Sequence, residues 1–465
     1  MHCGTLASGT LFALAYAILA PACGGTPTNS GFGGENTVAD SDAGLFDEAG
    51  DPIFSDGGTA SKPGCTGLQC QQVTCPAGQD TTVTGTAFAP NGTLALYDVI
   101  AYVPNAALAP MAQGASCDQC AGQVSGNPVV TSLSDSKGNF VLENVPVGTN
   151  IPLVLQVGKW RRQVVIPEVK ACVETKLADP NLTRLPKNQG EGDLPKIALT
   201  TGSADPLGCI LPKMGIDASE FSQGPGGKAR VNVYEGNGGT HAPNATPFWS
   251  DANQLKAYDL VILSCEGDEN LQTKPAAARS AMEAYTNMGG RIFGSHYHYV
   301  WFQYGSANFQ GTAQWEGDGT ADDSGGPYKV DTSFPKGLAF ADWLVAVGAS
   351  TTPGQVGLND TKADVGTVNV PSQRWITDSS LSSTKYLSFN TPVGAAPSAQ
   401  CGKAVFGDMH IGVSSGGSAS VVDDSFPAGC SSSLSPQEKA LAFLFFDLSS
   451  CIQPEGAPPV PPAPK

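Results

Sequence analysis

The sequence predicts a multi-domain protein, in which an antiparallel β-sandwich is followed by a three-layer α/β domain with a mostly parallel, flavodoxin-like sheet. In residues 64–177, short alternating apolar strands are separated by turn residues, which is typical of a sandwich. In residues 195–452, unbroken apolar runs alternate with helical patterns, as expected when strands are buried on both faces of a parallel sheet. The length of 465 residues accommodates two such domains and a tether.

The composition limits both the class of function and the compartment. The formal net charge is -17 and only 14% of the residues are charged, so we expect no nucleic-acid partner. The 13 cysteines are too many for an ordinary reduced cytosolic protein. We therefore expect an exported protein in an oxidising compartment.

Residues 1–23 have the features of a signal peptide. The apolar run Leu11–Ala20 is too short to span a bilayer, and the sequence Ala-Pro-Ala-Cys-Gly ends this segment around Cys23. This sequence resembles the processing site of bacterial lipoproteins, which implies a lipid on Cys23 and membrane contact through that anchor only, at the outer membrane or cell surface. The alternative is a plain secretory signal and a secreted or periplasmic protein. Residues 24–63 are rich in Gly, Ser, Thr, Asn and Asp and predict a disordered tether.

The segment from residue 64 to 177 carries the alternation of a half-buried sheet. Apolar side chains recur at Val99, Ala101 and Val103, and the pairs Asn-Gly and Lys-Gly mark turns. The sequence SDSKGNFVLENVPVG resembles the carboxypeptidase regulatory-like domain, which has a transthyretin-type fold. This resemblance implies a module without catalytic residues. Residues 178–194, rich in Asn, Asp, Pro and Gly, predict a linker to the second domain.

The second domain, residues 195–452, is organised around one predicted strand–helix–strand unit. Leu260–Leu263 predicts a buried strand, a helix follows it, and Arg291–Gly294 predicts the next strand. Ligands of open α/β sheets bind beyond the carboxyl ends of the strands. Four polar residues fall at that end: Cys265, Glu266, Ser295 and His296.

Further strands are predicted at 196–201, 231–234, 385–389 and 404–407, and a helix at 334–347. The last helix has an explicit beginning, with Ser435 as cap, Pro436 at the first position and Glu438 completing a capping box. The Pro-rich residues 453–465 predict a disordered tail.

Two motifs carry a second resemblance, which covers roughly residues 195–451. YDLVILSCEG, a helix, and then YTNMGGRIFGSH together resemble the ThuA-like branch of the class I glutamine amidotransferase-like superfamily. In that pattern one histidine follows the central strand and another closes a late strand, which implies His296 and the His410 of VFGDMHIG. An amidotransferase also needs a cysteine in a Gly-x-Cys-x-Gly elbow, and Gly294-Ser295-His296-Tyr297 has none. We therefore expect no glutamine hydrolysis.

The resemblance and the strand-end positions together predict a site for a carbohydrate-like small molecule. We expect His296, His410 and Glu266 to be the catalytic groups, because imidazole and carboxylate exchange protons near neutral pH. Predicted ligand-binding residues are Ser295, Cys265, Tyr297 and Thr201, and possible stacking surfaces are Tyr297, Tyr299 and Trp301. If the protein is an enzyme, a sugar-related hydrolase or isomerase is expected. The alternative function is non-catalytic surface recognition or adhesion on a degenerate enzyme fold.

We expect no cofactor and no bound metal. A metal site is the competing interpretation, in which the pairs His296-x-His298 and Asp408-x-His410 converge and supply imidazole and carboxylate ligands. A third interpretation leaves these histidines as hydrogen-bonding residues near loops and places the tyrosines and Trp301 in the core.

The cysteine positions predict one disulfide, Cys401–Cys451. The final helix of about 15 residues is about 22 Å long, so Cys430 and Cys451 flank it at opposite ends and should not pair. Cys209, Cys265 and Cys430 then remain on the ligand side, where they can form one bond and leave one thiol. For the pair Cys117-Asp-Gln-Cys120 we expect structural disulfides rather than a zinc or redox motif. The first half holds an even number of cysteines: Cys65, Cys70, Cys75, Cys117, Cys120 and Cys172.

Overall fold

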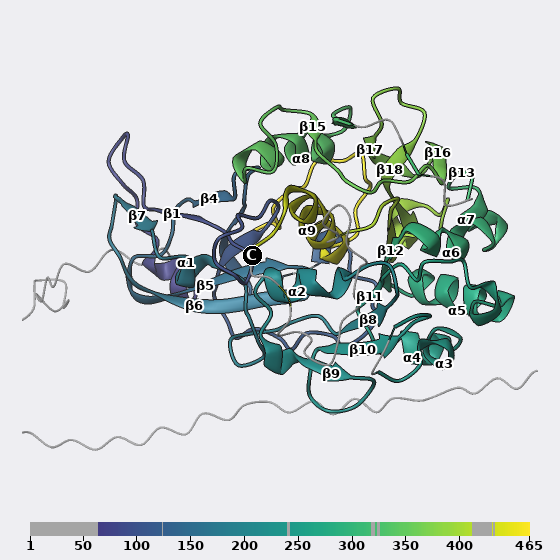
Figure 1. The fold of residues 1–465 in the computed structure, drawn as a ribbon. Helices are drawn as coiled ribbons and strands as arrows, with labels where there is room; N and C mark the ends of the chain where they lie inside the picture. The colour runs from purple at the N-terminus through teal and green to yellow at the C-terminus, as the bar shows by residue number, and fades with distance from the viewer. Residues whose placement is uncertain are drawn as a thin grey trace, which may run out of the picture. The chain divides into compact units, whose positions relative to one another are not determined.

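The computed structural model describes residues 64–122, 124–239, 242–317, 321–322, 326–411, 430 and 433–465. The predicted signal peptide, the lipid attachment at Cys23 and the whole predicted tether therefore lie outside the described residues. The described residues belong to one compact unit (Figure 1). One hydrophobic core runs through both halves of this unit, so the predicted linker at 178–194 does not separate two independent bodies.

The first half contains two β-sheets, called here the N-terminal sheet pair. A three-stranded sheet has the order β4-β1-β7 and a four-stranded sheet the order β3-β2-β5-β6. Buried side chains such as Val83, Phe140 and Leu153 belong to the same core cluster, so one core serves both sheets. The bounds are β1 (Thr82–Thr86), β2 (Ile100–Pro104), β3 (Pro128–Leu133), β4 (Asn139–Leu142), β5 (Gly148–Val157), β6 (Trp160–Val169) and β7 (Glu174–Leu177), with 3-10 helices η1 (Gly67–Gln71) and η2 (Cys120–Gly122) and helix α1 (Pro180–Thr183).

The second half, called here the α/β part, is built on a ten-stranded mixed sheet. Its order is β15-β14-β17-β18-β19-β12-β11-β8-β10-β9, and the strands from β19 to β9 are parallel. The bounds are β8 (Ile197–Thr201), β9 (Phe221–Gln223), β10 (Val231–Glu235), β11 (Leu260–Leu263), β12 (Arg291–Ser295), β14 (Tyr328–Val330), β15 (Gln355–Val356), β17 (Gln373–Thr377), β18 (Thr384–Thr391) and β19 (Gly402–Gly407). A separate ribbon pairs β13 (Ala313–Trp315) with β16 (Val365–Val368). A large mixed sheet with helices confirms the predicted α/β class.

Helices cover both faces of this sheet, because alternate strand residues belong to different cores. Ile262 packs with one cluster and Val261 with the other. On one side lie α2 (Ile210–Lys213), α8 (Pro335–Ala346) and α9 (Pro436–Ser449), and on the other α3 (Ala245–Trp249), α4 (Ala252–Leu255), α5 (Ala276–Asn287), α6 (Val300–Gln303) and α7 (Ala307–Gln310). The 3-10 helices are η3 (Leu207–Cys209), η4 (Ala218–Glu220), η5 (Leu271–Thr273), η6 (His296–Tyr299) and η7 (Pro397–Ala399).

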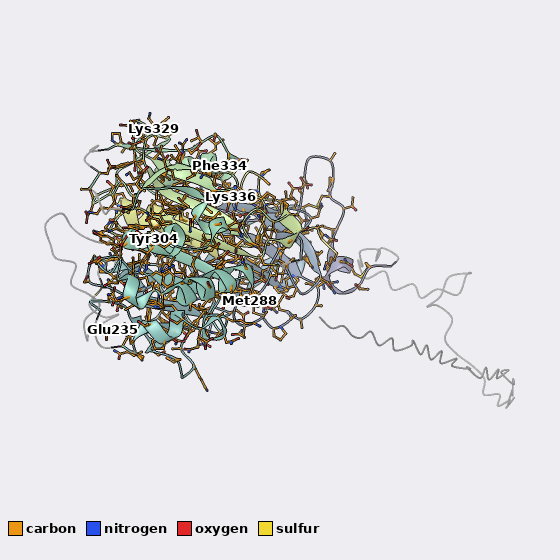
Figure 2. The ribbon with its side chains drawn as sticks, turned by 90° about the vertical axis from the view of Figure 1, so that its right-hand side faces the viewer. Glu235, Met288, Tyr304, Lys329, Phe334 and Lys336 are labelled. Carbon is orange, nitrogen blue, oxygen red and sulfur yellow. A yellow bond between two sulfur atoms is a disulfide. The ribbon has the colours of Figure 1, made fainter. Side chains whose placement is uncertain are left out.

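Helix α9 joins the two halves of the molecule. Its predicted capping box is confirmed, with Ser435 and Glu438 exchanging side-chain and backbone hydrogen bonds. Phe445 and Phe446 contact the ring of Trp160 on β6, so the helix packs between the large sheet and the N-terminal sheet pair. Lys336 at the start of α8 (labelled in Figure 2) forms an ion pair with Asp447 of α9. Few α9 side chains reach solvent, which explains its strongly apolar sequence.

The prediction of a disordered tail at 453–465 is wrong. Thr131 Oγ1 on β3 donates to the carbonyl of Pro462 at 2.5 Å, and the Lys465 amide donates to the carbonyl of Pro128 at 2.9 Å. Strand β3 is an edge of its sheet, and an extended Pro-rich segment can cover such an edge. The composition alone did not reveal this docking surface.

Five disulfides join the described cysteines: Cys65–Cys70, Cys75–Cys172, Cys117–Cys401, Cys120–Cys451 and Cys209–Cys430. The predicted Cys401–Cys451 bond is wrong, because each of these cysteines pairs with the short Cys117–Cys120 loop of the N-terminal sheet pair. The prediction treated the α/β domain as separate, whereas the first half packs against the side where Cys401 and Cys451 lie. The expected outcome for the remaining three is confirmed: Cys209 bonds Cys430, and Cys265 keeps its thiol.

Candidate functional site

The central turn of the site is a strand-to-helix elbow at His296. Strand β12 ends at Ser295, and η6 begins at His296, whose φ of +33° lies in the left-handed region. That region is strained for a residue with a Cβ, and such strain concentrates at functional sites. A nucleophile elbow has the same strand–turn–helix form and projects one side chain at the top of the sheet. Here the projected side chain is an imidazole.

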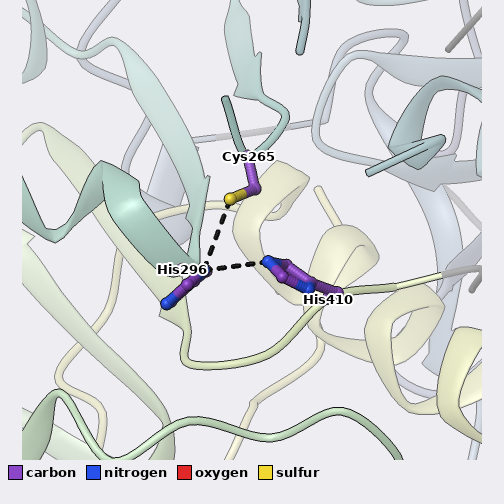
Figure 3. Close-up of side chains that lie close together, drawn as sticks. All are labelled: Cys265, His296 and His410. Atoms are coloured by element: carbon purple, nitrogen blue, oxygen red, sulfur yellow. Dashed lines mark hydrogen bonds between the residues drawn. The ribbon is translucent and has the colours of Figure 1, made fainter. Parts of the chain in front are cut away.

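The structure brings His296 and His410 into direct contact. His296 Nδ1 lies 2.9 Å from His410 Nε2, and the two ring centroids are 4.7 Å apart (Figure 3). His410 follows β19, which pairs with β12 in parallel, so the carboxyl ends of the two strands place both rings at one edge. His296 is buried, whereas the His410 side chain is 14% exposed. The predicted meeting of these two histidines at the sheet edge is confirmed.

Cys265 completes the cluster from the end of β11. Its Sγ lies 3.4 Å from His296 Nδ1 (Figure 3). The amide of Gly267 approaches the sulfur at 3.5 Å. Burial, followed by the charge of Asp205, raises the pKa of the thiol to about 12. Without a cation nearby, Cys265 is therefore a thiol and a poor nucleophile at neutral pH. Cys265, His296 and His410 are called the thiol–imidazole cluster below.

Each imidazole has a carboxylate on its far nitrogen. Asp360 Oδ2 lies 2.6 Å from His410 Nδ1, and Asp364 Oδ2 lies 3.2 Å from His296 Nε2. Burial alone would raise the pKa of Asp360, but hydrogen bonds from Lys362 and His410 lower it below its ordinary value. Both aspartates come from the segment between β15 and β16, in which the sequence shows no regular period. Sequence reasoning missed them for that reason.

Asp205 ties the strand ends together beneath the cluster. Its carboxylate accepts hydrogen bonds from Ser295 Oγ at 2.5 Å, the Ile411 amide at 2.6 Å and the Cys265 amide at 3.4 Å. These donors follow or end three neighbouring strands, so one buried side chain sets the spacing of all three. Asp205 was also missed, although it lies in the loop after the first predicted strand of the α/β part.

Three predicted site residues support the loops around the cluster. Glu266 is buried in an ion pair with Lys274 Nζ at 2.5 Å and also accepts from Asn237 Nδ2 at 2.8 Å. Thr201 Oγ1 donates to the carbonyl of Tyr234 at 3.3 Å. Ser295 is engaged by Asp205, as described above. The carboxylate of Glu266 thus has structural partners, and its predicted catalytic role stays a prediction.

Of the aromatic residues after the elbow, Tyr297 is partly exposed, and Tyr299 and Trp301 lie in the core. The Tyr297 ring is half-buried, 4.1 Å from the His296 ring. Tyr299 and Trp301 are each 1% exposed, so the prediction that they offer stacking surfaces is wrong. Trp301 Nε1 donates to His298 Nδ1, and His298 Nε2 lies 2.8 Å from the Ser264 carbonyl. Their rings complete the core beneath α6.

The metal interpretation based on His-x-His and Asp-x-His pairs is wrong in its ligand set. Burial lowers the pKa of His298 to about 4, and both ring nitrogens of this neutral imidazole already have protein partners. The carboxylate of Asp408 accepts from the Asp364 amide at 2.8 Å. Residues two apart do not share a face here, because the chain leaves the strand at His296 and turns into η6.

A cavity of about 570 Å³ lies away from the thiol–imidazole cluster. Its lining includes Cys117, Asp118, Gln156 and Lys159, beside one of the two disulfides that join the halves of the molecule. Lys159 there contacts Asp259 at 2.5 Å. The cavity and the cluster are therefore separate features.

Comparison with known proteins assigns no family to the chain. No family model matches it, and no curated protein does either. Among solved structures, the cytoplasmic protein STM3548 from Salmonella typhimurium is 11% identical and covers 55% of this chain and 99% of its own, with a TM-score of 0.30. A mutant type II cohesin–X-dockerin complex from Acetivibrio cellulolyticus is 15% identical over 31% of this chain and 76% of its own, with a TM-score of 0.15. Scores this low carry no argument about fold or function.

Two observations bear on the compartment. The five disulfides indicate an extracytoplasmic protein, because such bonds persist in oxidising environments. In the part of the chain that the structure describes, no helix has the length and hydropathy needed to cross a membrane.

Proposed function

We propose that the α/β part binds or modifies a small, carbohydrate-related molecule at the sheet edge that carries the thiol–imidazole cluster. The observation that supports this function best is the convergence of Cys265, His296 and His410 from three separate strand ends. A strained elbow at the centre of a mostly parallel sheet, at the carboxyl ends of its strands, is where ligands of such folds bind. The ThuA-like motifs lie on the same residues.

The exposed part of the cluster limits what a ligand can touch. His410 and Tyr297 reach solvent, whereas Cys265 and His296 lie behind them. Imidazole and phenol edges suit a ligand with hydroxyl or carbonyl groups, and the half-buried Tyr297 ring offers an apolar face to a sugar ring. Asp360, which is 40% exposed, adds an acceptor at the same opening. If the protein is an enzyme, we propose a sugar-related hydrolase or isomerase.

For the cellular setting, we propose an exported cell-envelope lipoprotein with its lipid on Cys23. The signal-like segment and the Cys23 processing motif support this location, and the disulfides fit the same compartment. Within this proposal, the N-terminal sheet pair is a regulatory-like module without catalytic groups.

The second candidate function is non-catalytic surface recognition. It is favoured by the imidazole at the elbow, where an amidotransferase-like enzyme would carry a cysteine, and by the protonated state of the buried Cys265 thiol. Ligand binding without turnover would support this alternative.

The proposal can be tested by thermal shift of the purified mature protein with a panel of sugars and keto-sugars. We expect at least one compound to raise the melting temperature of the wild type and of Lys329→Ala, a surface control on β14. The same compound should leave Tyr297→Ala and His410→Ala unshifted. A panel that shifts no protein, or shifts all four equally, would contradict the proposed site, and product analysis of a binding compound separates enzyme from receptor.

A further inference from the structure

We infer that Cys265, His296 and His410 form a binding site for a divalent transition-metal cation of the zinc class. The inference goes beyond the proposed function, because metal binding at these atoms requires no sugar-related ligand. The candidate ligand atoms are Cys265 Sγ, His296 Nδ1 and His410 Nε2, which all lie within 4.8 Å of one another. Three protein ligands from imidazole and thiolate are the number found in catalytic zinc sites, where a fourth position is open.

Two of the three distances between these atoms are close to those of a tetrahedral site. With zinc–nitrogen bonds of about 2.0 Å and zinc–sulfur bonds of about 2.3 Å, tetrahedral angles separate two nitrogens by roughly 3.3 Å and nitrogen from sulfur by roughly 3.5 Å. The structure has 2.9 Å between His296 Nδ1 and His410 Nε2, and 3.4 Å between His296 Nδ1 and Cys265 Sγ. The third pair, Cys265 Sγ and His410 Nε2, lies within 4.8 Å, so the His410 ring has to move toward the sulfur to complete the site.

The hydrogen count around the two imidazoles also points to a cation. Asp360 faces His410 Nδ1 at 2.6 Å, and Asp364 faces His296 Nε2 at 3.2 Å. When both carboxylates accept an N–H from neutral rings, the remaining ring nitrogens turn their lone pairs toward each other at 2.9 Å. In that tautomer the two lone pairs need a positive charge between them, either an additional proton or a metal ion, whereas a neutral His296 protonated on Nδ1 donates directly to His410 Nε2. Carboxylates in this position are the usual second partners of metal-bound histidines.

Cys265 favours the metal ion over the proton. A proton shared by the two imidazoles explains their contact but gives the sulfur no role, whereas a metal ion uses all three atoms. The ten other cysteines in the described part of the chain are paired in disulfides, and Cys265 remains a fully buried thiol. A buried thiolate is costly unless a cation neutralises it, and the Gly267 amide near the sulfur would support the charged form. The nearby carboxylates of Asp205, Asp360 and Asp364 add to the attraction for a cation.

The test is metal binding to the purified mature protein, with no sugar added. After chelator treatment, we expect titration to show one tightly bound Zn²⁺ per chain, and Co²⁺ to give a sulfur-to-metal charge-transfer band in the near ultraviolet. Cys265→Ala should abolish that band, and His410→Ala should weaken binding at least 100-fold. Asp360→Asn should weaken it about 10-fold through loss of the second partner of His410.

The matched control is His298→Gln, which removes an imidazole outside the cluster and should retain the band. Two outcomes would overturn the inference: failure of the wild type to bind one equivalent of metal, and Co²⁺ binding without the thiolate band. Both are measured on the wild type, so they remain valid even if a variant fails to fold. Persistence of the band in Cys265→Ala would overturn it as well. Because no sugar is present, these outcomes are independent of the thermal-shift test of the proposed function.

Discussion

Two buried polar clusters in the α/β part differ in how their charges are balanced. One, called here the anchor network, consists of Lys336, Lys403, Asp447 and Glu455, and places each lysine against a carboxylate at 2.5–2.6 Å. The thiol–imidazole cluster instead brings three potential donors of electron pairs to one point. Complementary pairing under α9 stabilises the fold, whereas convergence of like groups at the strand ends lowers stability unless a ligand is bound. The difference indicates which buried polar residues serve structure and which serve function.

The largest expected effect comes from breaking the anchor network. Asp447→Ala should lower the free energy of unfolding by about 3–5 kcal/mol, because Lys336 is then buried without its ion-pair partner and Lys403 keeps only Glu455. Urea denaturation followed by circular dichroism measures the change. Lys170→Ala is the control, since its ion pair with Glu168 is exposed and should contribute less than about 1 kcal/mol. Equal effects of the two variants would show that the anchor network contributes no more to stability than an exposed ion pair.

A smaller effect is expected from Asp98, which lies beside the anchor network. Burial raises the pKa of Asp98 from 3.8 to about 7, although the nearby Lys336 opposes the shift. The folded protein therefore binds a proton that the unfolded chain has released, and stability should fall as the pH rises from about 4 to about 7. Asp98→Asn should remove this dependence and stabilise the protein at pH 8 by more than about 1.4 kcal/mol, the equivalent of one pKa unit.

Asn suits this position because Asp98 has a φ of 62°, which Asn tolerates. Melting curves of the wild type and Asp98→Asn between pH 4 and 8 provide the measurement. Parallel pH profiles for the two proteins would show that Asp98 is not the group responsible.

The smallest effect on stability is expected in the thiol–imidazole cluster itself. His410→Gln should change the free energy of unfolding by less than about 1 kcal/mol, because the ring is partly exposed and its contact with His296 does not fill the core. Denaturation of the metal-free wild type and of metal-free His410→Gln measures this change without a contribution from metal binding. A loss as large as that of Asp447→Ala would mean that His410 is a structural residue, and it would weaken both proposals for the site.

The sequence predicted the parts of the site that follow from regular patterns. Runs such as Leu260–Leu263 and Arg291–Gly294 locate strands, and the parallel arrangement then requires the residues after them to meet at one edge. Together with the ThuA-like resemblance, these strand-end positions indicated His296 and His410. Their carboxylate partners, Asp360 and Asp364, were not predicted, because they lie in an irregular segment.

The sequence also did not predict the long-range packing between the two halves of the molecule. Nothing in the spacing of Cys401 and Cys451 reveals that a loop 284 residues before the first of them supplies both partners. The edge of β3 that receives the Pro-rich tail is likewise a property of the folded first half. The Pro-rich composition predicted a disordered tail and gave no sign of where it would dock.

The paired bonds from Cys117 and Cys120 have a mechanical consequence. Cys401 directly precedes β19, and Cys451 follows α9. The Cys117–Cys401 bond therefore attaches the first half to the start of β19, and the other end of this strand leads to His410. Tension applied through the first half of the protein would enter the second half by covalent bonds at that base. Such a load would reach the sheet at the end of β19 opposite the thiol–imidazole cluster.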